Sequence, residues 1–116
     1  MEISPLGERL VRVTLIGRLD TPGVDGLESR FVSSLAPDAK SAIVDMSQVD
    51  FVSSMGIRML ISAARSLRAR QSVLAIFGAT RRVGQVFEAV ALHKILPVCA
   101  TEDEALAAVA SRTPAS

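Results

Sequence analysis

Two adjacent serines offer the clearest chemistry in this sequence, because they stand where a predicted strand and loop pass into a predicted helix. Ser53 and Ser54 are followed there by Met55 and Gly56. The first N–H groups of a helix have no partner within the helix, and the helix dipole is positive at that end, so an anion or a phosphoryl group is stabilised there. Serine is also a leading N-cap residue, and the residue types alone favour the simpler interpretation that one serine only caps the helix.

Aspartates flank the same region. Asp45 ends a predicted strand and, with Asp50, is one of the only two acids close to the start of the long helix, whereas Asp20 precedes an earlier predicted helix. Aspartate is common in turns and at N-caps. Turn formation and capping therefore explain Asp45 and Asp20 most simply, and a role in a binding site is the alternative.

The sequence offers few groups for catalysis or for binding metals and phosphates. His93 is the sole histidine, so a histidine metal cluster is impossible and a serine–histidine pair would depend on one residue. Gly78 and Gly84 lack the spacing and the Gly-Lys-Ser/Thr ending of a phosphate-binding loop. We therefore expect no metal, no cofactor and no enzymatic turnover.

The composition is that of one compact domain in a reducing compartment. The chain has 116 residues, 49% of them hydrophobic, a formal net charge of +1 and a single cysteine, Cys99, so it has no intramolecular disulfide. Arg65, Arg68 and Arg70 form the densest basic group. The sequence has no Trp or Tyr for base stacking, which disfavours nucleic acid as a partner.

Targeting and membrane segments are not indicated. No segment resembles a signal peptide or reaches the roughly 18 apolar residues of a membrane span, so we expect a soluble cytoplasmic protein without membrane insertion. We expect a single domain over residues 1–112 and a flexible tail over residues 113–116.

The hydrophobic pattern alternates between strands and helices. Runs rich in β-branched and apolar residues predict strands over residues 10–16, 41–46, 72–77 and 94–99, with residues 2–6 beside the first of them. Pro97 places the last strand at an edge of the sheet, because proline has no N–H group to donate to a neighbouring strand. Helices are predicted from Thr21 to Pro37, from Ser54 to about Arg70, from Thr80 to about Val90 and from Thr101 to Val109. This alternation predicts an α/β fold with substantial parallel pairing.

The helix from Ser54 has the most regular pattern. Its predicted core face consists of apolar residues at helical spacing: Ile57, Leu60, Ile61, Ala64 and Leu67. Met55 and Met59, four residues apart, lie next to each other outside this set, where methionines can fill gaps or form an adaptable contact surface. We interpret Ser53 to Met59 as a partner contact, so the sequence predicts that Met59→Asp weakens binding at little cost in stability.

The segment from Ile43 to Ile57 resembles the STAS domain family, in particular the bacterial anti-sigma factor antagonists. It is similar to the family pattern of a hydrophobic strand, Asp-Leu-Ser, a short loop with Phe, and Asp-Ser-Ser-Gly at the start of a helix. The segment from Gly17 to Asp20 is similar to the family's Gly-Glu-Leu-Asp, and residues 101–109 are similar to its closing Glu-Ala-Leu helix. The resemblance covers nearly the whole chain.

The resemblance implies a small mixed β-sheet of four to five strands flanked by about four α-helices, and a role as a binding module. Antagonists of this family bind an anti-sigma factor, typically also a serine kinase of the histidine-kinase-like ATPase fold, and so free a sigma factor. In many members the kinase phosphorylates the second serine of Asp-Ser-Ser-Gly, and a serine phosphatase reverses the step. The partner-binding residues expected here are Asp20, Asp45, Ser53, Ser54, Met55, Gly56 and Met59.

The sequence departs from the family pattern at the phosphoacceptor. With Phe51 and Gly56 fixing the alignment, Ser53 takes the place of the family's Asp, Ser54 of its first serine and Met55 of its phosphoacceptor. A thioether cannot be phosphorylated. Either Ser54 or Ser53 accepts the phosphate instead, or the protein is an unswitched antagonist.

Two other functions remain open at this point. STAS domains also occur as accessory subunits of lipid or anion transport systems. A small-ligand or nucleotide-binding domain is a further alternative, although the lack of a polar catalytic cluster counts against an enzyme.

Overall fold

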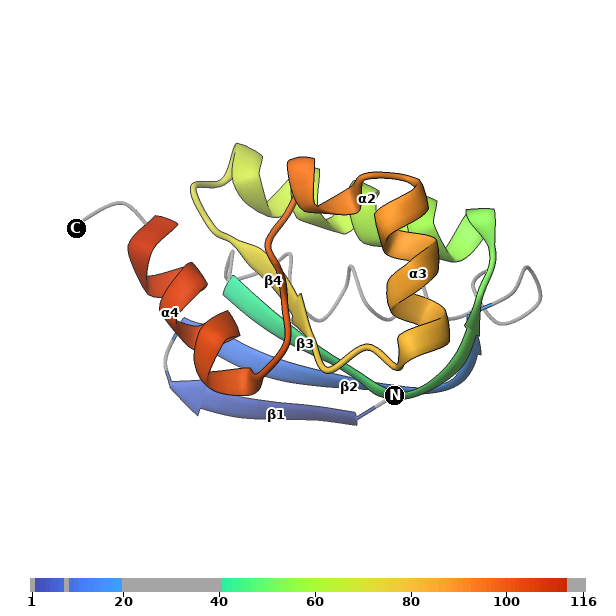
Figure 1. Ribbon diagram of the computed structural model, residues 1–116. Helices are drawn as coiled ribbons and strands as arrows, with labels where there is room; N and C mark the ends of the chain where they lie inside the picture. Colours follow the sequence, from blue (N-terminus) through green and yellow to red (C-terminus); the bar gives the residue numbers. More distant parts are fainter. Residues whose placement is uncertain (1, 8, 20–40, 113–116) are drawn as a thin grey trace.

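The structure is a computed structural model that describes residues 2–7, 9–19 and 41–112 (Figure 1). Its strands are β1 (Glu2–Gly7), β2 (Leu10–Leu19), β3 (Ser41–Val52), β4 (Leu74–Phe77) and β5 (Val98–Cys99). Its α-helices are α2 (Ser54–Ala69), α3 (Arg81–Ala89) and α4 (Glu102–Arg112), and a short 3-10 helix, η1, spans Leu92–Lys94. The helix predicted from Thr21 to Pro37 lies outside the described residues.

The strands form one mixed sheet in the order β1-β2-β3-β4-β5, so strands that follow each other in the sequence lie side by side (Figure 1). β1 pairs antiparallel with β2, placing Ile3 opposite Val13, and the other three pairs are parallel. The predicted α/β class and the mixed sheet are confirmed. The described part of the chain contains three α-helices where about four were predicted.

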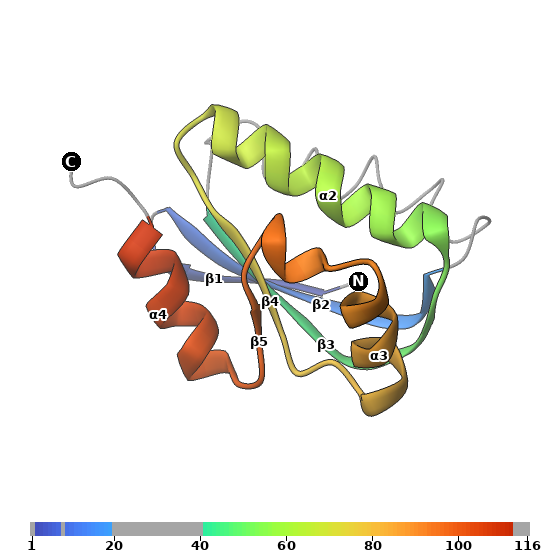
Figure 2. The same cartoon turned by 45° about the horizontal axis from the view of Figure 1, so that its top comes forward.

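Alternating side chains of the strands build an apolar cluster on each face of the sheet. Ala42 of β3 lies in the larger cluster, which includes Leu60 of α2 and Phe87 of α3. Ile43, the next residue, points to the opposite face and packs in a smaller cluster with Ala105 of α4. The sheet therefore lies between α2 and α3 on one side and α4 on the other, as the two views in Figures 1 and 2 show.

β3 continues farther than the strand predicted over residues 41–46. It runs to Val52, and its register with β2 shifts at two places. These irregularities leave Ser47 and Gln48 exposed while Val49 and Val52 return to the core. The polar residues that predicted a loop are therefore outward-facing side chains of an irregular strand.

The strand predicted over residues 94–99 is much shorter in the structure. Only Val98–Cys99 form a strand, and η1 occupies the start of the predicted segment. The carbonyl oxygen of Pro97 accepts a hydrogen bond from the N–H of Ile76 at 3.0 Å. β5 pairs with β4 alone, so the edge position that Pro97 predicted is confirmed.

Two helices begin at the threonines from which they were predicted to start, and each threonine caps its helix. The Thr80 hydroxyl accepts a hydrogen bond from the N–H of Val83 at 3.3 Å at the start of α3. The Thr101 hydroxyl accepts one from the N–H of Glu104 at 3.2 Å, and the Glu104 carboxylate accepts one from the N–H of Ala100 at 2.9 Å. This reciprocal arrangement fixes the first turn of α4.

The position predicted for Met59 is wrong. Its side chain is only 1% exposed and packs in the larger apolar cluster, with Ala63 beside it on the same helix. The face that α2 turns toward the sheet is wider than the stripe predicted from Ile57, Leu60 and Ala64, since it also includes residues 59 and 63. Met59 therefore packs between α2 and the sheet and does not belong to the exposed surface of the helix.

Replacing Met59 by an acid should therefore destabilise the protein strongly and not merely weaken binding. We expect Met59→Asp to lower the free energy of unfolding by about 4 kcal/mol or more, because it buries a carboxylate without a partner. Met59→Leu, which nearly conserves volume, should cost less than about 1.5 kcal/mol. Urea unfolding followed by circular dichroism measures both.

Ser62→Asp is the matched control, because Ser62 is an exposed residue of the same helix. Its stability should stay within about 0.5 kcal/mol of the parent protein. If Met59→Asp were as stable as this control, the burial of Met59 described above would be wrong.

Candidate functional site

The candidate site is the junction at which β3 ends and α2 begins, beside the end of β2. Ser53 is the N-cap of α2, and its hydroxyl oxygen accepts a hydrogen bond from the N–H of Gly56 at 3.2 Å. The same hydroxyl donates to the carbonyl oxygen of Leu19 at 2.9 Å, and the N–H of Ser53 donates to that oxygen as well, also at 2.9 Å. The capping role expected of one serine is therefore confirmed, and the serine is Ser53.

Gly56 is held against the end of β2. A Cβ atom at this position would lie 2.7 Å from the carbonyl oxygen and 2.9 Å from the Cβ of Leu19. These atoms belong to a paired strand and cannot move aside easily, so only glycine lets the first turn of α2 approach this closely. Gly56 is buried, and it acts in the site by positioning its neighbours.

Ser54 and Met55 are the two residues of this turn that reach the surface. Ser54 is exposed, and within the described part of the chain its hydroxyl makes no hydrogen bond. Met55 is half-buried and packs its inner side against the larger apolar cluster. The junction thus presents a hydroxyl and a thioether on a turn that is bonded to the end of β2.

Asp45 lies in β3, before the irregular part of the strand that leads to this turn. Its carboxylate accepts a hydrogen bond from the N–H of Ser47 at 2.9 Å, but both residues belong to β3, so the prediction that Asp45 ends a strand in a turn is wrong. A Cβ atom on Gly78 would lie 3.5 Å from the same carboxylate, which brings Asp45 next to the end of β4. Asp20, the other predicted aspartate of the site, lies outside the described residues.

Sequence reasoning missed a pair of side chains on the outer face of the sheet. The guanidinium of Arg18 stacks over the ring of Phe51 at 4.4 Å from its centroid, because the register of β2 and β3 places the two residues opposite each other. Phe51 is 37% exposed and neighbouring Ile16 is 50% exposed. The contact could not be predicted from the sequence, because it depends on register shifts between β2 and β3 that local sequence patterns do not indicate.

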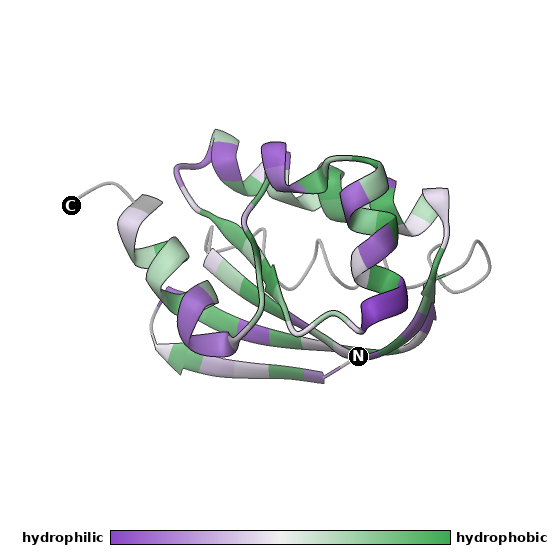
Figure 3. Cartoon of the chain, in the orientation of Figure 1, coloured by the Kyte–Doolittle hydropathy of each residue, from purple (hydrophilic) through white to green (hydrophobic). Residues whose placement is uncertain are grey.

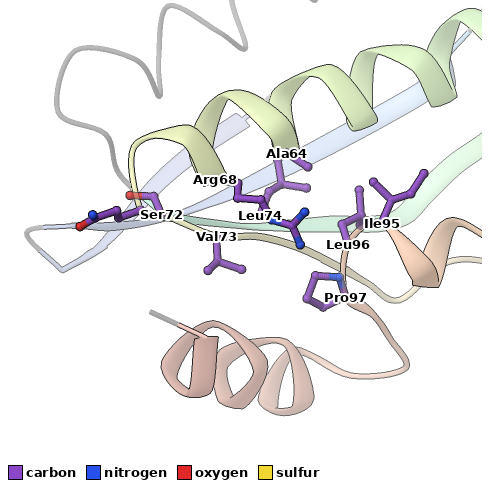
Figure 4. Close-up of a pocket in the computed structure, with 9 residues that line it drawn as sticks. Ala64, Arg68, Ser72, Val73, Leu74, Ile95, Leu96 and Pro97 are labelled. Carbon is purple, nitrogen blue, oxygen red and sulfur yellow. The ribbon is translucent and has the colours of Figure 1, made fainter. Parts of the chain in front are cut away.

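A cleft of about 420 Å³ lies at the other end of α2, between that helix and the connection leading to β5 (Figure 4). Its walls are mainly apolar and include Leu74, Leu96 and Pro97. Arg68 extends from α2 across this cleft toward Leu96 and Pro97 (Figure 4). Among the described residues that line it, Arg68 is the only charged one.

A second cleft, of about 390 Å³, brings together the single histidine and the single cysteine of the chain. His93, Cys99 and Glu88 line it. Among the described residues, no three His, Cys, Asp or Glu side chains are arranged to hold a metal ion. None of the helices within residues 54–112 is long and apolar enough to cross a membrane.

Comparison with known families agrees with this geometry. The family model for the STAS domain matches residues 7–105, which include β2, β3, the capped start of α2 and the beginning of α4. The chain belongs to the STAS domain family. The resemblance carried by residues 43–57 is therefore confirmed at the level of the family.

Curated relatives of this STAS domain carry names from sigma-factor regulation. BtrV of Bordetella bronchiseptica, named as a candidate anti-sigma factor antagonist, is 26% identical over 100 residues that cover 86% of each chain. An anti-sigma-B factor antagonist of Listeria monocytogenes is 34% identical over 61 residues, 53% of this chain and 54% of the relative.

Solved structures of STAS domains share the fold. An anti-sigma factor antagonist from Mycobacterium paratuberculosis is 25% identical, with a TM-score of 0.79 over 94% of this chain and 92% of its own. The STAS domain of a SulP transporter from Vibrio cholerae is 24% identical, with a TM-score of 0.70 over 92% of this chain and 85% of its own. The fold is thus common to regulators and to transporter domains.

The tight contact of Gly56 with Leu19 leads to a prediction about stability. Gly56→Ala should lower the free energy of unfolding by about 1–3 kcal/mol, because the added methyl group meets the backbone of β2. Gly84→Ala is the matched control, since Gly84 lies in α3 and a Cβ atom there would have nothing within 4 Å. That change should stabilise the protein by up to about 1 kcal/mol. Urea unfolding of both variants decides, and effects of the same sign would contradict the contact.

Proposed function

We propose that this STAS domain is an anti-sigma factor antagonist, which binds an anti-sigma factor and thereby frees a sigma factor. The observation that carries the proposal is the exposed Ser54 and the half-buried Met55 on a helix start that is held rigidly against β2. A contact surface that is already ordered loses little conformational entropy when a partner binds. The names of the relatives at 26% and 34% identity point to the same function.

The proposed contact surface is centred on Ser54 and Met55 and reaches toward Asp45 and, in the sequence, Asp20. Ser53 and Gly56 act by fixing the first turn of α2. The Ser53 hydroxyl is bonded to Leu19 and to the N–H of Gly56, and Leu19 fills the space beside Gly56. Met59 is not part of the surface because it is buried. The function is binding and requires no turnover by this chain.

The partner that we propose is an anti-sigma factor that is also a serine kinase of the histidine-kinase-like ATPase fold, with a serine phosphatase as its opponent. Of the two serines that could accept phosphate, Ser54 is the more accessible. The hydroxyl of Ser53 both donates to Leu19 and accepts from Gly56, so phosphorylation there would break the cap of α2. Met55 stands where the family has its phosphoacceptor, which favours an antagonist that is not switched by this kinase.

An accessory role in a transport system is the second candidate, favoured by the similar fold of the SulP transporter domain. The two candidates differ in the partner. Tagged full-length protein should capture an anti-sigma factor from native lysate, and mass spectrometry of the bound proteins identifies it. Capture of a transport ATPase or permease instead would favour the second candidate.

The contact surface predicts which variants lose the partner. Ser54→Tyr should abolish capture of the anti-sigma factor, because a bulky side chain at the centre of the surface prevents close approach. Gln85→Tyr, at an exposed position of α3, is the control and should leave capture unchanged. Both changes should alter stability by less than about 0.5 kcal/mol, so thermal unfolding checks that each variant is folded. Normal capture by Ser54→Tyr would place the contact elsewhere.

The thioether at residue 55 predicts a change in phosphorylation. Incubated with the captured kinase and ATP, the parent protein should gain little or no phosphate, because a hydroxyl one residue away on the helix points about 100° from the family's acceptor position. Met55→Ser should be phosphorylated, and its binding should then become sensitive to ATP, since the phosphate brings unpaired charge into the interface. Mass spectrometry measures the product. Stoichiometric phosphate on Ser54 of the parent protein would show that the switch has moved by one residue.

A further inference from the structure

The exposed side of α2 carries arginines, and the nearest acids in the sequence are Asp50 before the helix and Glu88 well after it. Residues 51–87 contain six arginines and no aspartate or glutamate: Arg58, Arg65, Arg68, Arg70, Arg81 and Arg82. The whole chain is nearly neutral, with a formal net charge of +1. The acids are therefore concentrated elsewhere, and α2 is a locally cationic element of a neutral protein.

Three of these arginines form a line along α2 that begins at Ser54. Helical spacing places Ser54, Arg58, Arg65 and Arg68 within an arc of about 80° over a length of about 21 Å. All four residues are exposed. Ile61 lies in the same line and is half-buried. We call Ser54, Arg58, Arg65 and Arg68 the arginine stripe.

Among the residues that the structure describes, the charges of the stripe have no partner. Within the residues that the structure describes, the guanidinium groups of Arg58, Arg65 and Arg68 make no ion pair or hydrogen bond. Arg12 on β2 behaves differently, since it forms an ion pair with Glu102 of α4 at 2.5 Å. A row of like charges without partners among the described residues costs some repulsion, and an acidic partner would remove that cost.

The opposite side of the sheet has the opposite character. The first turn of α4 holds Glu102, Asp103 and Glu104, and it is coloured hydrophilic in Figure 3. Because α2 and α4 cover different faces of the sheet, the arginines of α2 and the acids at the start of α4 lie on opposite sides of it. A charged partner would be oriented by this separation before any close contact formed.

We propose that the arginine stripe is the second half of the partner interface and that it binds an acidic surface of the anti-sigma factor. This inference rests on the proposed function, since it extends the contact from Ser54 along α2. The stripe begins at the proposed contact and ends where Arg68 crosses the apolar cleft (Figure 4). The acidic surface of the partner should therefore be elongated, reaching along roughly 21 Å of helix.

A protein partner fits the stripe better than a nucleic acid or a membrane. The stripe has three cations and no aromatic residue beside them on α2, whereas a single-stranded nucleic acid site combines cations with stacking platforms. A membrane-binding helix inserts an apolar face, but the apolar face of α2 is buried against the sheet. Arginine also forms planar bidentate pairs with carboxylates, which suits aspartate and glutamate side chains.

The stripe also gives a physical reason why negative charge at its start would release the partner. An acid or a phosphoryl group at residue 54 stands one helical turn before Arg58, where it neutralises the first cation of the stripe. The same negative charge repels the acidic surface of the partner. A single negative charge at residue 54 would thus both weaken the attraction of Arg58 for the partner and repel the partner's acidic surface.

Charge reversal tests the stripe on the anti-sigma factor captured by the full-length protein. At 50 mM salt, we expect the Arg58→Glu/Arg65→Glu double variant to bind about 100-fold more weakly than the parent protein in isothermal titration calorimetry. Arg65→Lys should lose less than about tenfold, because it keeps the charge. Arg9→Glu is the matched control, an exposed arginine of the β1–β2 connection, and should bind within about threefold of the parent protein.

Two further measurements separate charge from shape. Parent affinity should fall steeply between 50 and 300 mM salt, and the double variant should lose most of this salt dependence. Ser54→Asp should also weaken binding, although an acid in the first turn favours the helix itself. Binding of the double variant at parent affinity, with Ser54→Tyr still inactive, would overturn the stripe and leave the proposed function standing.

A probe that does not depend on the anti-sigma factor tests the stripe even if no anti-sigma factor is captured. In ¹⁵N NMR titrations of the full chain at 50 mM salt, a glutamate decamer should shift amide signals of residues 54–68, and the double variant should lose these shifts. This result would support the acidic partner even if no anti-sigma factor were captured. A random DNA duplex that binds the stripe with Kd below about 10 μM at 150 mM salt, or vesicles of anionic lipid that bind it in sedimentation, would overturn it.

Discussion

The carbonyl oxygen of Leu19 is the point on which the candidate site depends. It accepts two hydrogen bonds from Ser53, one from the backbone and one from the side chain, and it leaves room beside it only for the glycine at position 56. These contacts tie the last residue of β2 to the first turn of α2. The position of the first turn, and with it that of Ser54 and Met55, depends on this backbone group, while the buried face of α2 holds the rest of the helix.

The two neighbouring serines have divided their tasks. The hydroxyl of Ser53 donates one hydrogen bond and accepts another inside the protein, whereas Ser54 is exposed. An aspartate, which the family pattern has at position 53, can also accept from the first turn of a helix but cannot donate to Leu19 when ionised. The serine at this position therefore strengthens the link to β2 without placing a buried charge at the junction.

Local patterns predicted most of the fold. The strands and the threonine caps of α3 and α4 depend on residues close together in the sequence. The same is true of the edge strand β5, which Pro97 directly precedes. Met59 was misplaced because a stripe drawn through Ile57, Leu60 and Ala64 was too narrow for a helix that lies flat on a sheet. The family pattern also led directly to the start of α2 as the site.

What could not be predicted depends on residues far apart in the sequence. The hydrogen bond from Ser53 to Leu19 spans 34 residues, and no local pattern indicates that these two groups meet. The stacking of Arg18 on Phe51 depends in the same way on register shifts between β2 and β3. The residues of the candidate site could thus be proposed from the sequence, but not the contacts that hold Ser53 and Gly56 in place.

The order of the strands has a consequence for biosynthesis. Since each described strand pairs with the one that precedes it in the chain, the sheet can be assembled from one edge to the other as the ribosome delivers it. No strand has to be inserted between two that are already paired. The β1–β2 hairpin can form as soon as it leaves the exit tunnel, and its far edge then serves as a template for β3. Leu19 also leaves the ribosome before the helix that docks on its carbonyl group.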